Sequence, residues 1–222
     1  MSHTITKYDA NILNHHAKRG DVVEFGRTLD NLAQREAPNG YDRADILLLA
    51  KDEAGDNIIH SACAMGNRNI IVFIYGLNDF TLKPGVLRSI INARNNMGNT
   101  PIHLATQHGQ QACAAALLER GADLNAEGSF GLRVAHFATR DRYPDMLRYV
   151  LQRGADPNAV TRSGDTPAHF AARNRDMFCL RALHTGGATL RGYNMAGETP
   201  ANIAERMSYE VMVVWMKERN IF

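Results

Sequence analysis

One ordered pattern of small, apolar and polar residues repeats along this chain every 33 positions. A glycine opens each copy of the pattern, and a short apolar stretch that contains a histidine follows it. The copies share glycines at Gly98, Gly131, Gly164 and Gly197 and histidines at His103, His136 and His169. A period of this length indicates a linear array of small units, each of which buries its apolar face only by stacking on its neighbours.

A second block repeats in the same register and predicts a second helix in each unit. Residues 117–125 read LLERGADLN, residues 150–158 read VLQRGADPN, and residues 183–189 form a degenerate third copy. The stretch from Cys113 to Glu119 has its apolar residues on one side, which is typical of a packed helix.

Each unit also carries start and stop signals for its helices. Pro101, Pro167 and Pro200 suit the first turn of a helix, where a missing N–H breaks no hydrogen bond, and the threonine before each is a natural N-cap. The glycines that open the pattern supply the positive φ of a tight hairpin turn. We expect the second helices to end at Gly121, Gly154 and Gly187.

The Thr-Pro-Ile-His-Leu-Ala motif at residues 100–105 and its copies resemble the ankyrin repeat. The resemblance covers Asp52 to the last residue and rests on two motifs that keep one register. It implies an all-α solenoid of helix-turn-helix units joined by β-hairpin loops. In this family the motif threonine and histidine also bond each other and the neighbouring loop.

We divide the chain into six segments on this register. They are a degenerate N-terminal capping repeat at residues 1–50, repeats at 51–94, 95–127, 128–160 and 161–193, and a C-terminal capping repeat at 194–222. The first repeat holds an insertion of about ten residues around positions 78–89, because Gly55 and Gly98 lie 43 positions apart. In the last helix, Val211, Val214 and Trp215 are expected to cover the final interface; the alternative is that its Met and Trp residues form a partner surface.

Two departures from the family pattern predict local changes. Arg133 and Val134 replace Thr-Pro in the third repeat, so the Thr–His bond is lost and the helix start lacks its usual cap. Arg142 and Arg175 replace the glycine between the two helices, where we expect the turn to change.

Composition narrows the function classes. Of 222 residues 45% are hydrophobic and 22% charged, with a net charge of +2 that is too small to favour nucleic acid. No apolar run could span a membrane, and no secretory signal is evident, so we expect a cytoplasmic or nuclear protein, with export by another route left open. Its three cysteines make a poor disulfide framework and fit small buried positions.

Catalysis and metal binding have little support. The motif histidines occupy one position per repeat and cannot converge on one ion, and no nucleotide-binding or catalytic motif occurs. We therefore expect no enzyme, no cofactor and no metal.

The resemblance implies binding through the concave face and the hairpin tips. The partner-binding candidates are Gln107, Arg140, Arg173 and Arg206, four residues after the motif histidine; Arg120 and Arg153, before the helix-ending glycines; and Met97 and Phe130, at hairpin tips. The arginines at 140, 173 and 206 form a ladder by register. The ladder is either a basic groove for an acidic protein segment or a solvated face whose arginines pair with Asp141, Glu205 or nearby carboxylates. Phe130 either anchors a partner or packs on the adjacent hairpin.

The function that follows is a monomeric adaptor, inhibitor or scaffold that binds another protein. The alternatives are a dedicated chaperone of one client, a pathogen effector that mimics host ankyrin adaptors, and nucleic-acid binding through the ladder. Asn125 and Asn158 resemble asparagines that are hydroxylated in eukaryotic ankyrin proteins, although a role as turn residues is the simpler expectation.

Overall fold

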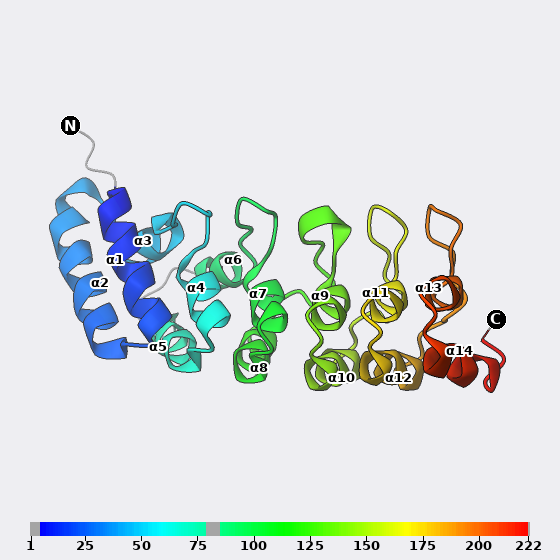
Figure 1. Cartoon of the computed structure of the whole chain (residues 1–222). Helices are drawn as coiled ribbons and strands as arrows, with labels where there is room; N and C mark the ends of the chain where they lie inside the picture. The colour runs from blue at the N-terminus through cyan, green and yellow to red at the C-terminus, as the bar shows by residue number, and fades with distance from the viewer. Residues whose placement is uncertain (1–4, 79–84, 222) are drawn as a thin grey trace. The chain divides into compact units, whose positions relative to one another are not determined.

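The computed structural model describes residues 5–78 and 85–221, which form short α-helices joined by loops (Figure 1). They fall into two compact units, 1–123 and 124–222, each of which is described by itself. Unit 1 contains α1 (Lys7–Arg19), α2 (Val22–Glu36), α3 (Arg43–Leu49), α4 (Ile58–Met65), α5 (Arg68–Asn78), α6 (Val86–Ile91), α7 (Pro101–Gln107) and α8 (Gln111–Glu119). Unit 2 contains α9 (Val134–Arg140), α10 (Pro144–Gln152), α11 (Pro167–Arg173), α12 (Met177–Thr185), α13 (Pro200–Arg206) and α14 (Glu210–Lys217). None of the described helices is long and apolar enough to cross a membrane.

Unit 1 stacks three helix pairs. The first helices α1, α4 and α7 pack in that order, and α2, α5 and α8 are their second helices. The period of 33 does not account for α3 and α6, which pack against each other through buried residues such as Ile46 and Ile90. Part of the expected insertion, residues 79–84, lies outside the described residues.

Unit 2 repeats the same arrangement. Its first helices α9, α11 and α13 stack in order, while α10 packs against α12. The loops before the first helices project on one side of these helices, and the second helices lie on the other side (Figure 1). The core between the two layers contains fully buried residues such as Phe137, Leu147 and Leu183.

The start and stop signals act as predicted. Helices α7, α11 and α13 begin at Pro101, Pro167 and Pro200. The glycines after the second helices, Gly121, Gly154 and Gly187, have φ of 86°, 95° and 85°. No β-strand is assigned in the described ranges, where Lys51 and Asn57 form one isolated bridge, so the expected β-hairpins are not formed as strands. Each loop is instead closed by a few backbone hydrogen bonds, such as those from the Thr161 N–H to the Asp165 carbonyl at 3.0 Å and from the Gly164 N–H to the Thr161 carbonyl at 2.9 Å.

The expected change of turn at Arg142 and Arg175 is wrong. Both residues adopt a positive φ, 62° and 54°, in place of the glycines that hold the same conformation at Gly66 and Gly109. A left-handed backbone costs a residue with a side chain about 1–2 kcal/mol. The packing of neighbouring helices therefore imposes the turn on these arginines.

Replacing Arg142 tests this strain. We expect Arg142→Gly to be more stable than Arg142→Ala by about 1 kcal/mol, because both variants lose the arginine side chain and only glycine tolerates the positive φ freely. Urea denaturation followed by the fluorescence of Trp215, the single tryptophan, measures the difference in unit 2. Equal stability of the two variants would show that the turn is unstrained.

The start of α9 keeps half of its cap. The Thr–His side-chain bond is lost at Arg133, as predicted, but the Arg133 N–H still donates to Nδ1 of His136 at 3.1 Å. An arginine side chain has no acceptor for the helix N–H groups, so the other half of the cap is missing.

The last helix buries Trp215, as predicted, but not the two valines expected beside it. Met212 and Met216 are buried with Trp215, whereas Val211 and Val214 are exposed. Both sets of positions, 211/214/215 and 212/215/216, follow the spacing of one helix face, so packing against the neighbouring helices selects the second set and the helical period alone does not. Trp215 meets the His184 ring edge-on at 5.4 Å, which ties α14 to α12.

Candidate partner-binding surface

The motif histidines hold successive repeats together. In unit 2, Nδ1 of His169 accepts from the Thr166 N–H at 3.0 Å, and Nε2 lies 3.0 Å from the Glu198 carbonyl in the next loop. Because a backbone N–H can only donate, Nδ1 carries no proton and Nε2–H is the donor. His136 makes the same contact with the Asp165 carbonyl at 3.0 Å. Burial lowers the pKa of His136 to about 4, which keeps the ring neutral.

Three loops of unit 2, residues 128–133, 161–166 and 194–199, form what we call the tip row. Their tips are bonded in sequence: the Arg162 N–H donates to the Phe130 carbonyl at 3.1 Å, and the Met195 N–H donates to the Ser163 carbonyl at 3.0 Å. A Cβ at Gly131 or Gly164 would lie 3.0 Å from these backbone nitrogens, which explains the need for glycine. The tip row is therefore held by backbone bonds.

Apolar side chains project from the tip row and its edge. Phe130 is 72% exposed and has a φ of 56°, so it does not pack on the adjacent loop. Met195, Tyr193 and Val160 are exposed as well, and sequence reasoning missed them. The repeat register carried a signal for two of them, because Val160 and Tyr193 hold the same position in adjacent repeats.

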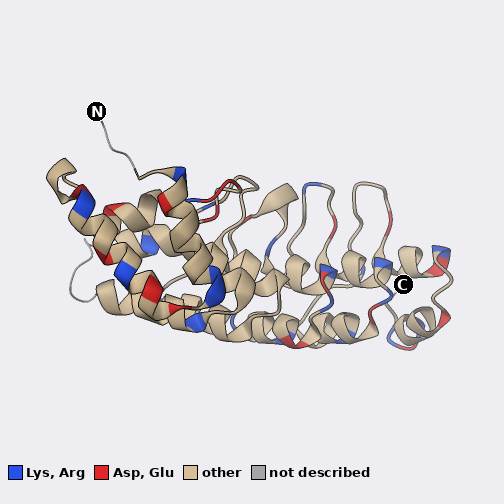
Figure 2. Cartoon of the chain, turned by 60° about the vertical axis from the view of Figure 1, so that its left-hand side comes forward, with Lys and Arg blue, Asp and Glu red and all other residues tan. Residues whose placement is uncertain are grey.

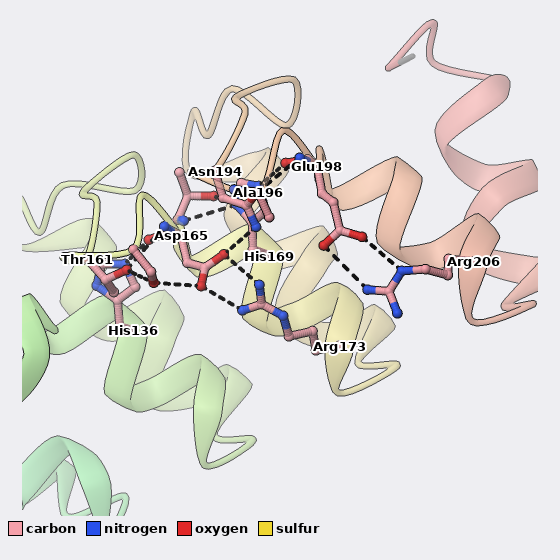
Figure 3. A network of polar contacts seen from close by, with 11 residues as sticks. His136, Thr161, Asp165, His169, Arg173, Asn194, Ala196, Glu198 and Arg206 are labelled. Atoms are coloured by element: carbon pink, nitrogen blue, oxygen red, sulfur yellow. Dashed lines mark hydrogen bonds and ion pairs between the residues drawn. The ribbon is translucent and has the colours of Figure 1, made fainter.

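Each ladder arginine of unit 2 is paired with a carboxylate. Arg173 binds Asp165 with two hydrogen bonds of 2.7 and 2.8 Å, and Arg206 binds Glu198 through Nε at 2.8 Å (Figure 3). Arg140 pairs with its neighbour Asp141, one of the pairs expected if the ladder is a solvated face. Glu205 pairs with Lys217 instead of with a ladder arginine.

Asp165 is the most connected of these carboxylates. Besides Arg173, it accepts from Ser163 Oγ at 3.0 Å and from Asn194 Nδ2 at 2.8 Å, and its side chain is 9% exposed. Burial raises the pKa of this carboxyl, but the hydrogen bonds from Arg173, Asn194 and Ser163 outweigh that effect and the pKa is lowered. The carboxylate thus ties two loops to α11.

The pairing follows from the repeat register. Asp165 and Glu198 both precede the motif threonine, eight positions before the ladder arginine of the same repeat. In the third repeat Leu132 takes this position, and Arg140 turns to Asp141. Acidic and basic positions of unit 2 therefore lie close together (Figure 2), and three carboxylates balance the three arginines.

The remaining predicted residues lie elsewhere. Met97 and Gln107 belong to unit 1, where Met97 is exposed and Gln107 half-buried. Arg120 and Arg153 lie at the C-terminal ends of second helices, with their guanidinium groups over the rings of Tyr75 at 5.0 Å and Tyr149 at 4.7 Å. The predicted set thus divides between the units and between the two layers of helices.

The described residues gather no group of three or more His, Cys, Asp or Glu side chains that could hold a metal ion. Cys63, Cys113 and Cys179 are free and buried.

Comparison with known proteins agrees with this architecture. A family model of ankyrin repeats in three copies matches residues 6–128, and a second, of ankyrin repeats in many copies, matches residues 117–171. No curated protein matches the chain. With the stacked helix pairs, the motif histidines that bond neighbouring loops and a family match over more than half its length, this chain belongs to the ankyrin-repeat family, whose members are generally protein–protein interaction modules.

Proposed function

We propose that this chain is a non-enzymatic adaptor or inhibitor that binds a partner protein through the tip row and the adjoining first helices of unit 2. The observation that carries the proposal is Phe130, an aromatic side chain that is both exposed and strained. Its left-handed backbone costs about 1–2 kcal/mol, and its ring contributes little to the core. A residue that destabilises the free protein in this way fits a role in binding.

The tip row favours binding because it is held in place before a partner arrives. The Phe130 carbonyl is fixed by the Arg162 N–H, so little backbone freedom remains to be lost. Exposed aromatic anchors on a rigid surface are typical of the few residues that dominate an interface. Met195 and Tyr193 would extend the apolar contact.

The ladder supplies polar contacts of both signs. Arg173 and Arg206 are oriented by Asp165 and Glu198, so their guanidinium groups are presented in a fixed direction. A partner that brings one apolar anchor and both donors and acceptors fits this surface better than a purely acidic segment, since carboxylates already neutralise the arginines.

Affinity capture from the native cell extract tests the proposal. We expect a partner bound by the wild type to be lost with Phe130→Ala, since an interface anchor contributes about 2 kcal/mol or roughly 30-fold in affinity. Arg140/Arg173/Arg206→Glu is expected to weaken the same partner by reversing the ladder.

Tyr8→Ala is the matched control. Tyr8 is also an aromatic residue and is 73% exposed, but it lies on α1 in unit 1, outside both the tip row and the second helices of unit 2. Recovery of the partner with Tyr8→Ala and its loss with Phe130→Ala would support the tip row. Recovery of the same partners with Phe130→Ala and with the triple arginine variant would refute it.

A further inference from the structure

A groove lies between the second helices α10 and α12 of unit 2. It has a volume of about 270 Å³ and a floor that includes Leu151 and Ala182. The second helices lie on the other side of the first helices from the loops, so the groove is separate from the tip row (Figure 1).

Gly186 opens this groove. The two preceding repeats carry Arg120 and Arg153 at the same register position, each with its guanidinium over a tyrosine ring. At position 186 there is no side chain, and a Cβ there would lie 2.8 Å from Cδ1 of Leu151. The fourth repeat thus lacks the arginine that would occupy the space, and Leu151 borders it instead.

The charged groups of the groove are all basic. Arg148 and Arg181 line it, and no acidic residue among those that the structure describes does. Arg148 pairs with Asp145, an exposed residue one turn earlier in α10, and exposed pairs of this kind are weak. Arg181 has no carboxylate partner within the described part of the chain.

An exposed aromatic residue continues the groove along α12. Phe178 precedes Arg181 by three positions and Ala182 by four, so the three side chains share one side of the helix. An apolar floor, a basic rim and an aromatic side chain therefore lie along one line. A volume below the range of small-molecule pockets suits one inserted side chain better than a whole ligand.

We propose that this groove is a second docking site, and that it binds an acidic segment of a partner protein. Carboxylates of the segment pair with Arg148 and Arg181, while one apolar side chain enters against Leu151 and Ala182 and another contacts Phe178. The proposal rests on the basic rim and on the space at Gly186, and it does not depend on the function of the tip row.

Two synthetic peptides test the proposal on the full chain: a helix-forming peptide of Glu, Leu and Ala, and the same peptide with Lys for Glu. Binding is measured by fluorescence anisotropy and located by backbone amide chemical shifts. We expect the Glu peptide to bind, to shift amides of α10 and α12, and to bind at least tenfold more tightly than the Lys peptide.

Variants then separate charge from shape. Arg148→Glu/Arg181→Glu should weaken the Glu peptide at least tenfold and favour the Lys peptide, and Gly186→Gln should weaken binding by filling the floor without adding charge. Arg27→Glu/Arg191→Glu makes the same charge change outside the groove lining and outside the tip row, and it should leave binding unchanged; Arg27 is paired with Glu24 on an exposed helix face, as Arg148 is with Asp145. Equal binding of both peptides, shifts confined to other elements, or equal losses in the two double variants would overturn the proposal. Thermal denaturation of each variant confirms that a loss does not come from unfolding.

Discussion

Asp165→Ala is expected to lower the free energy of unfolding of unit 2 by about 2–3 kcal/mol. The substitution leaves Arg173 and Asn194 without the carboxylate that accepts from both, and the loss of one partner of a buried ion pair costs about 3–5 kcal/mol. The expected loss of stability is smaller than this here, because the Arg173 side chain is 37% exposed. Urea denaturation monitored by Trp215 fluorescence gives the change.

Glu198→Ala is the matched control for this prediction. Glu198 occupies the same register position and pairs with the equivalent ladder arginine, Arg206, but its side chain is 26% exposed and that of Arg206 57%. We expect a loss below about 1 kcal/mol, since exposed pairs contribute little. Similar losses in the two variants would contradict the role assigned to burial and to the wider network of Asp165.

Unit 2 should lose stability as the pH falls from 6.5 to 4. The pKa of His136 is lowered from 6.5 to about 4, mainly by burial, and that of His169 is lowered for the same reason. Between pH 4 and pH 6.5 these histidines bind more protons in the unfolded chain than in the folded chain. The free energy of unfolding therefore decreases as the pH is lowered through this range, and the full stability is present above pH 6.5. The loss from His136 alone approaches about 3 kcal/mol near pH 4.

His136→Asn isolates this histidine. Asparagine already replaces the motif histidine at Asn202, where its Oδ1 accepts from the Thr199 N–H at 3.0 Å. The variant should cost about 2 kcal/mol at pH 7 through the lost bond to the Asp165 carbonyl, and its stability should depend less on pH than that of the wild type. His108→Asn, at an exposed position of unit 1, should keep the full pH dependence. An unchanged slope in His136→Asn would show that other groups cause the acid sensitivity.

The repeat period predicted most of the fold because stacking constrains the same positions in every copy. Proline at the helix starts and glycine after the second helices are local signals, and both act where the sequence places them. The 33-residue period does not predict α3 and α6, because neither helix belongs to the two-helix unit that repeats. The turn at Arg142 does not follow from local preference, because the neighbouring helices impose the positive φ of a glycine on an arginine.

The candidate site was harder to predict from sequence. The ladder positions follow from the register, but the bond between Arg173 and Asp165 joins a helix end to a loop, and no helical spacing indicates such a pair. The position of Phe130 at a loop tip follows from the repeat register, whereas the exposure of its ring depends on how the adjacent loop packs. The groove at Gly186 is visible as a substitution in the register, yet its depth depends on where Leu151 lies.

The backbone bonds of the tip row have a consequence for how this surface can diverge. Two backbone bonds join the tips, from the Arg162 N–H to the Phe130 carbonyl and from the Met195 N–H to the Ser163 carbonyl. Every residue except proline has both a backbone N–H and a carbonyl, so these bonds do not depend on the side chains. Side chains at positions 130, 162 and 195 can therefore be exchanged while the loops keep their places, provided that Gly131 and Gly164 stay. New specificities can arise on this frame by single substitutions, without refolding of the repeats that present them.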